Sequence, residues 1–172
     1  ASFNHPGREV LCFDGCVFVP PLDERIVALE CFNRGDDYGD AYFHALDRGW
    51  HVGAIGVSDH HRDDWGHPTL PRAGILAPAL TLPQLQAALM ARRVFATRSP
   101  TLALPVMGGA GLVGGRLHLA AADSLRIDVW CHDPRASQSR ARLELWSNGG
   151  KLIATHETRG LRLIRRDSLE GA

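Results

Sequence analysis

The spacing of the apolar residues changes near residue 98, and this change limits the folds that are open to the chain. Before it, apolar runs at 27–32 and 51–57 alternate with a stretch of helical spacing at 40–48. This order is typical of an α/β layer with parallel strands. We therefore predict strands and helices in alternation over residues 1–98.

A further helix is predicted over residues 81–93. Thr81 is a suitable N-cap, Pro83 stands in the first turn, and the leucines that follow form an apolar stripe. Short apolar runs at 73–76 and 94–97 flank this helix and are predicted to be strands.

After residue 98 the helical spacing disappears, and apolar and polar residues alternate as in half-buried strands. The pair Asn148-Gly149 is typical of a hairpin corner, and the five glycines within 108–115 indicate a loop or hairpin. We predict a small antiparallel, sandwich-like β domain over residues 99–172. Its strands are expected at 116–119, 125–130, 140–146, 151–155 and 161–164.

Composition restricts the partners of the chain. Its 19 basic residues balance 19 acidic ones, and its arginines are scattered along the sequence, so we expect no nucleic acid as a partner. No apolar run reaches the roughly 18 residues of a membrane span, so we expect no membrane partner either. A cytoplasmic location is predicted, and an upstream signal stays open because residue 1 is Ala.

The four cysteines are too few for a dense disulfide scaffold. Cys12 and Cys16 flank Asp14-Gly15, which predicts a tight hairpin with that pair at its corner. Ordinary buried thiols are expected here, with a metal clip or a disulfide as the alternatives.

Histidine and aspartate gather in the segment 58–64, directly after the apolar run that ends at Val57. In α/β folds, ligands collect at the carboxyl ends of strands. Asp59 and His61 are two residues apart, so in extended chain their side chains point the same way. A carboxylate with an imidazole suits Zn, Mn or Fe, whereas a solvated polar loop is the alternative.

Four segments carry a resemblance to a known family: Asn4-His5-Pro6, the run 29–33, the run 45–61 that ends in Ser58-Asp59-His60-His61, and the run 80–97. Together they resemble the carboxyl-terminal part of a PHP domain, the polymerase and histidinol phosphatase superfamily of metal-dependent hydrolases. The CehA/McbA-like branch is the most similar. The resemblance implies the carboxyl-terminal portion of a distorted (β/α)7 barrel over 1–98, followed by a small antiparallel β domain.

The resemblance also implies roles for individual residues. The implied metal ligands are His5, Asp59 and His61, and Asp59 and His61 are also the implied catalytic residues. Arg72 and Asn33 are the implied substrate contacts, Arg72 because a guanidinium binds anions such as phosphate well. Glu30 and Asn33 match a strand-end pair that the resemblance places beside the metal site. For Arg72 a surface ion pair is the alternative.

The family's site begins with a His-X-His pair on the first strand, and nothing in this chain supplies that pair. We therefore expect a fragment of a metal-dependent hydrolase that is inactive on its own. With a divalent metal (Zn, Mn or Fe), the full-length protein is expected to hydrolyse a small-molecule phosphate ester or related ester through metal-activated water.

Two alternatives do not involve catalysis. The β domain could dock a partner or a carbohydrate through Trp130, Trp146 and the glycine-rich loop. A fragment with an exposed sheet edge could instead assemble into a homo-oligomer.

Overall fold

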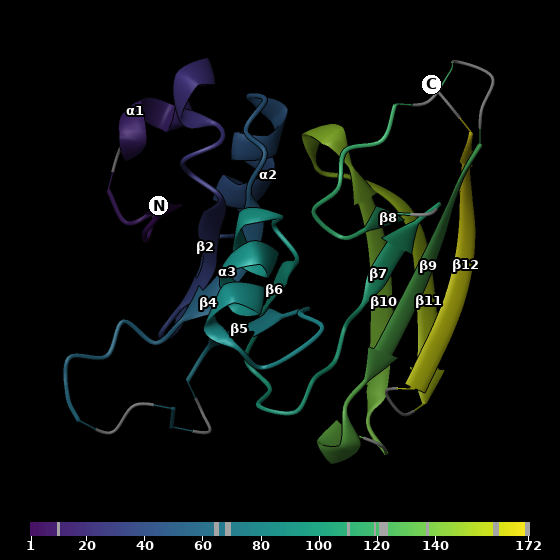
Figure 1. Cartoon of the computed structure of the whole chain (residues 1–172). Helices are drawn as coiled ribbons and strands as arrows, with labels where there is room; N and C mark the ends of the chain where they lie inside the picture. The colour runs from purple at the N-terminus through teal and green to yellow at the C-terminus, as the bar shows by residue number, and fades with distance from the viewer. Residues whose placement is uncertain are drawn as a thin grey trace.

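The computed structural model describes residues 1–9, 11–63, 66–67, 70–109, 111–118, 120, 124–136, 138–159 and 162–170, with the backbone alone at 158–159 and 162–170. Figure 1 shows helices and short strands gathered in the amino-terminal part (1–98), beside long strands in the carboxyl-terminal part (99–172). No helix in the described residues is long and apolar enough to cross a membrane.

The amino-terminal part is organised around β2 (Ala28–Asn33), which is almost entirely buried. It pairs in parallel with β1 (Ser2–Phe3) on one side and with β4 (Gly53–Val57) on the other. The short β3 (Asp36–Asp37) folds back antiparallel against its end. The strands predicted at 27–32 and 51–57 are thus confirmed, and so is their parallel direction.

Two short helical segments precede β2, namely α1 (Phe13–Cys16) and the 3-10 turn η1 (Pro20–Leu22), and α2 (Gly39–Asp47) connects it to β4. The helix predicted over 40–48 is confirmed by α2. The hairpin predicted at Asp14-Gly15 is wrong, because residues 13–16 form α1 and the residues on either side of it belong to no strand. All four cysteines are free thiols.

The remaining elements of this part are β5 (Arg72–Ile75), α3 (Leu82–Met90) and β6 (Val94–Thr97). They confirm the predicted strands at 73–76 and 94–97 and a shorter form of the predicted helix. The strands β5 and β6 pair antiparallel and pack closely against β4. A Cβ atom placed on Gly56 of β4 would lie 2.6 Å from the backbone oxygen of Arg72, so this approach requires glycine.

The carboxyl-terminal part consists of antiparallel strands in two sheets, of order β12-β9-β7-β8 and β10-β11. Its elements are β7 (Val106–Gly108), β8 (Gly111–Leu112), β9 (Ser124–His132), η2 (Pro134–Ala136), β10 (Arg140–Ser147), η3 (Asn148–Gly150), β11 (Lys151–Arg159) and β12 (Arg162–Glu170). The glycine-rich hairpin and the corner at Asn148-Gly149 are confirmed. Residues 116–118 are not a strand; Leu119 and Leu161, at the ends of two predicted strands, lie outside the described residues.

The predicted fold class, a portion of a (β/α)7 barrel, is wrong. In such a barrel, successive strands pair in parallel through an intervening helix. Here α3 lies between β5 and β6, yet these two strands pair antiparallel. The described residues form several small sheets and no closed barrel, with only three short α-helices.

The core of the amino-terminal part lies where α1 and α2 meet the sheet. Phe3 and Trp50 pack edge to face with their ring centroids 5.0 Å apart, and the Trp50 indole donates a hydrogen bond of 2.9 Å to the carbonyl of Cys16. Leu29 and Ala45 are completely buried beside them. This core fixes β1, β2 and β4 relative to one another.

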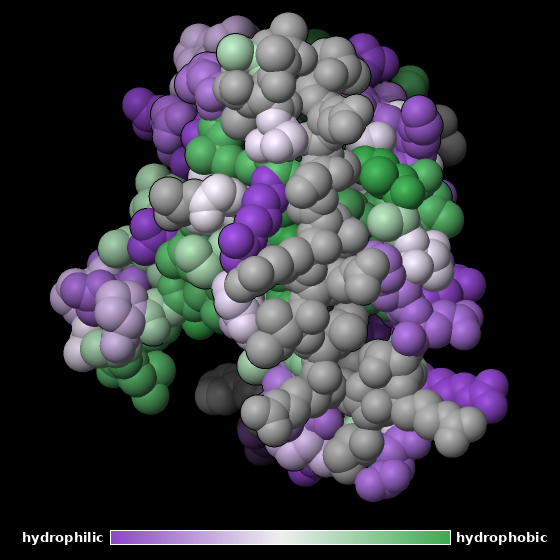
Figure 2. Space-filling view, turned by 90° about the vertical axis from the view of Figure 1, so that its right-hand side faces the viewer, coloured by the Kyte–Doolittle hydropathy of each residue, from purple (hydrophilic) through white to green (hydrophobic). Residues whose placement is uncertain are grey.

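Polar contacts join the two parts of the chain. The Asp47 carboxylate at the end of α2 accepts a hydrogen bond from the Gly149 amide at 2.9 Å, and Arg116 forms an ion pair of 2.7 Å with buried Asp23. Figure 2, which views the side of the carboxyl-terminal part, shows hydrophobic residues reaching the surface in several groups between hydrophilic ones.

Candidate functional site

Three parallel strands end at the same edge of the sheet in the amino-terminal part. His5 follows β1, Asn33 is the last residue of β2, and Asp59 comes two residues after β4. The parallel pairing of β1, β2 and β4 therefore gathers the predicted site residues at this edge. We call His5, Asn33, Asp59 and His61 the strand-end site.

The backbone is strained around this edge. His5 has φ 34°, Arg34 has φ 51° and Asp59 has φ 45°. Residues other than glycine rarely adopt this left-handed backbone region, and such backbone strain is concentrated at functional sites. The surrounding contacts must therefore hold these three residues in place.

Glu30 holds two of the site residues through hydrogen bonds. Its side chain is buried within β2, with 5% of the residue exposed. Its Oε2 atom accepts hydrogen bonds from the His5 backbone amide at 2.6 Å and from the Asn33 side-chain amide at 3.0 Å. One carboxylate oxygen thus connects the ends of β1 and β2.

Three buried side-chain atoms have no hydrogen-bond partner among the described residues: His5 Nδ1, Asn33 Oδ1 and Arg72 Nε. A buried polar atom without a partner is costly, and proteins keep few of them. All three belong to residues that sequence analysis assigned to metal or substrate binding. Asn33 is completely buried, so bulk solvent does not satisfy its oxygen.

Asp59 lies beside two arginines and one histidine. Its Oδ1 atom is 3.4 Å from His61 Nε2, and its Oδ2 atom is 3.8 Å from Arg8 and 3.7 Å from Arg34. Arg34 also donates from Nε to the Asp59 carbonyl at 3.2 Å. The His61 side chain is 79% exposed and the Arg34 side chain 52% exposed, so these ion pairs contribute little to stability.

The donor types of the strand-end site suit a divalent cation, because imidazole nitrogen and carboxylate oxygen are common ligands of Zn, Mn and Fe. The structure brings Asp59 and His61 together, and it connects His5 to Asn33 through Glu30. Within the described residues, however, no three histidine, cysteine, aspartate or glutamate side chains are grouped to hold a metal. The residues present therefore do not form a complete metal site.

Arg72 begins β5, which packs against β4 near the carboxyl end of that strand. Its guanidinium donates from Nη2 to the carbonyls of His67 and Leu70, at 2.9 and 3.0 Å. These bonds fix the guanidinium to its own loop, while the buried Nε atom keeps an unused N–H.

Sequence analysis missed Arg8 and Arg34, because it treated the arginines as scattered. Their positions carried a usable signal: Arg8 follows the Asn4-His5-Pro6 motif closely, and Arg34 directly follows Asn33. Arg98 was missed as well. It donates to the carbonyls of Arg34 and Asp36 at 2.7 and 2.8 Å and thereby fixes the turn after β2.

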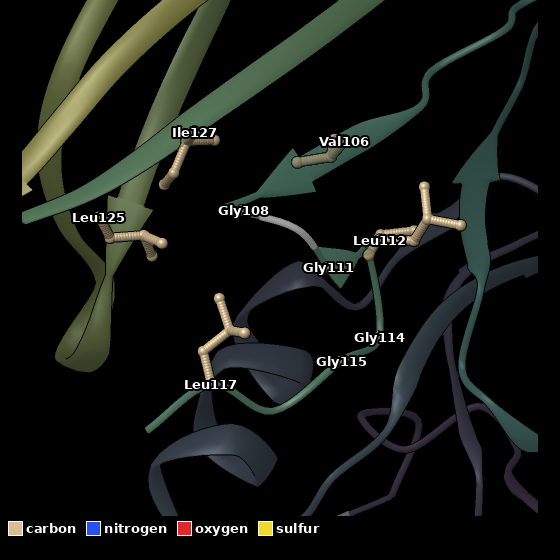
Figure 3. Close-up of a pocket in the computed structure, with 10 residues that line it drawn as sticks. Val106, Gly108, Gly111, Leu112, Gly114, Gly115, Leu117, Leu125 and Ile127 are labelled. Atoms are coloured by element: carbon tan, nitrogen blue, oxygen red, sulfur yellow. The ribbon is translucent and has the colours of Figure 1, made fainter. Parts of the chain in front are cut away.

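A separate cavity of about 180 Å³ lies in the carboxyl-terminal part, between the glycine-rich hairpin and β9. Figure 3 shows apolar side chains from β7, β8 and β9 and from Leu117 around it. Neither Trp130 nor Trp146 is among the described residues that line it. The Trp146 indole donates to Glu144 at 3.1 Å, and its ring lies 6.1 Å from that of Phe43 on α2.

No family model matches the chain, and no similar curated protein or solved structure was found. The resemblance to PHP hydrolases therefore stays a prediction, supported by the motifs in the sequence.

Proposed function

We propose that this chain forms part of a metal-dependent hydrolase that acts on a phosphate ester or a related ester. The observation that carries the proposal is the set of unpartnered buried atoms on His5, Asn33 and Arg72. Unsatisfied polar atoms at a strand-end edge are typical of a site built for a ligand.

The side chains in and beside the strand-end site suit two types of ligand, a cation and an anion. His5 and the Asp59–His61 pair offer nitrogen and oxygen donors to a divalent cation, and the arginines near Asp59 offer positive charge to an anionic ester. A bound cation would lower the pKa of a coordinated water and so supply hydroxide near neutral pH. Since the donors form two separate groups, we expect the isolated chain to bind metal weakly and to hydrolyse esters slowly or not at all.

Metal binding by the purified chain tests this proposal. We expect equilibrium dialysis against Mn²⁺ or Zn²⁺, followed by elemental mass spectrometry, to show saturable binding. Asp59→Asn should lose it. Asp63→Asn removes an exposed acid from the same loop and should bind as the wild type does. Equal binding by the wild type and both variants, or no binding by the wild type, would contradict the proposal.

The cavity in Figure 3 favours a second candidate, a non-catalytic module that binds a small apolar ligand or partner. Tryptophan fluorescence separates the two functions. A hydrolase site predicts that metal, rather than apolar ligands, changes the acrylamide quenching of the chain's tryptophans. A binding module predicts that apolar ligands, rather than metal, change the quenching.

A further inference from the structure

The buried carboxylate of Glu30 is unusual because a single oxygen atom receives both of its hydrogen bonds. The donors are the backbone amide of His5 and the side-chain amide of Asn33, and both belong to the strand-end site. Buried carboxylates are rare in proteins unless they are paired, and this one is paired only with site residues among the contacts described.

The hydrogen bond from Asn33 determines the orientation of its side-chain amide. If the amide were flipped, its oxygen would meet the Glu30 carboxylate, and two acceptors would face each other. Glu30 therefore requires the NH₂ group on its own side and leaves Asn33 Oδ1 as the atom without a partner. A carbonyl oxygen in that state accepts a hydrogen bond or binds a cation.

The bond to His5 acts on the backbone. The His5 amide lies 2.6 Å from Glu30 Oε2, and the same residue has φ 34°, a conformation that costs energy in any residue other than glycine. A charged acceptor strengthens the hydrogen bond and offsets that strain. In this conformation the ring Nδ1 atom of His5 is buried and has no partner among the described residues.

We propose that Glu30 is a positioning residue of the strand-end site, which holds His5 and Asn33 so that the buried His5 Nδ1 and Asn33 Oδ1 atoms are placed to contact a polar or cationic ligand. The nature of that ligand rests on the proposed function, whereas the positioning role does not.

Three variants test the proposal in the whole chain. Glu30→Met keeps the length of the side chain but removes the acceptor, and Glu30→Gln keeps one acceptor oxygen without charge. Glu9→Gln removes an exposed acid that follows the same motif and serves as the control. Mn²⁺ affinity is measured by titration, and the His5 amide and Asn33 side-chain NH₂ signals are followed by NMR.

We expect Glu30→Met to weaken Mn²⁺ binding about 10- to 100-fold, as is usual when a residue that orients ligands is lost. Its His5 amide and Asn33 NH₂ signals should move upfield. Glu30→Gln should retain most of the affinity with a smaller upfield movement, and Glu9→Gln should match the wild type. This graded order distinguishes positioning from a general loss of structure.

Unchanged His5 and Asn33 signals in Glu30→Met would overturn the proposal, as would Mn²⁺ affinity equal to that of the wild type. If Glu30→Met does not fold, the upfield movement in Glu30→Gln decides the question. If the wild type binds no Mn²⁺, the proposed function fails, and the two NMR signals still decide whether Glu30 positions these residues.

Discussion

At the scale of single residues, the strand-end site depends on one buried carboxylate, because Glu30 Oε2 accepts hydrogen bonds from both the His5 amide and the Asn33 side-chain amide. His5, Asn33 and Asp59 were identified from motifs, and the structure places them at one sheet edge. The bonds of Glu30 to His5 and Asn33 were not predictable, because His5 and Glu30 are 25 residues apart in the chain. Such contacts depend on strand pairing, which local patterns do not determine.

The cysteines give a prediction at this scale. Burial raises the pKa of the Cys31 thiol to about 12, and Cys31 is only 7% exposed, whereas Cys12 is half-buried. Since the thiolate is the reactive form, an alkylating reagent at pH 8 should modify Cys12 well before Cys31. Peptide mass spectrometry of the native chain over time measures the order. Equal rates at the two positions would contradict the described burial.

Asp133 gives a second prediction. Hydrogen bonds from the hydroxyls of Ser99 and Thr101 hold the pKa of its carboxyl below the ordinary 3.8. The charged form therefore stabilises the fold above pH 3.8, and this contribution is lost as the pH falls through the lowered pKa. Asp133→Asn should cost roughly 1.5–3 kcal/mol at pH 7. Chemical denaturation should show a smaller difference at pH 3, and a constant difference would contradict the account.

At the scale of elements, α2, α3 and most strands followed from periodicity, because the spacing of apolar residues is a local property. The direction of pairing did not. An alternation of strand and helix around α3 predicted parallel strands, yet β5 and β6 are antiparallel. The antiparallel direction depends on how the β5–β6 pair packs on β4, where glycines allow the backbones to approach.

Gly56 tests this packing. A Cβ atom there would lie 2.6 Å from the Arg72 backbone oxygen and 3.0 Å from its nitrogen, so Gly56→Ala must move β5. We expect a loss of about 1–3 kcal/mol, as is typical of overpacking. Gly35→Ala is the control, because nothing lies within 4 Å of its Cβ position. Urea denaturation of both variants measures the difference, and equal stability would contradict the β4–β5 contact.

At the scale of the whole molecule, the two parts are joined by contacts that no periodicity could predict. The His51 ring forms a hydrogen bond of 2.7 Å between its Nε2 atom and the Gly114 carbonyl, and the His51 amide donates to Asp23 at 2.8 Å. Arg92 donates to the His51 carbonyl, and Arg116 pairs with Asp23. These bonds anchor the glycine-rich loop to the amino-terminal part.

This junction should depend on pH. Burial lowers the pKa of His51 below its ordinary 6.5, and the nearby Arg92 and Arg116 disfavour its charged form further. The unfolded chain therefore takes up a proton first as the pH falls, so stability is full above pH 6.5 and declines below it. Hydrogen exchange of residues 111–116 should be faster at pH 5.5 than at pH 7.5, after correction for intrinsic rates.

Two variants control for other groups. His51→Gln keeps a donor for the Gly114 carbonyl without a titrating ring, so its protection should change less with pH. His118→Gln removes an exposed histidine of the same segment and should behave as the wild type does. The same pH response in His51→Gln as in the wild type would show that another group controls the junction.

The central proposal is that the carboxyl ends of β1, β2 and β4 contribute ligands to a weakly bound divalent cation. Paramagnetic Mn²⁺ tests it most directly, because it broadens the NMR signals of the amides nearest to it. The account predicts that low Mn²⁺ broadens the amides of residues 4–5, 33–34 and 57–61 first. Broadening centred instead on the exposed acids Asp36 and Asp37, or spread evenly over the surface, would contradict it.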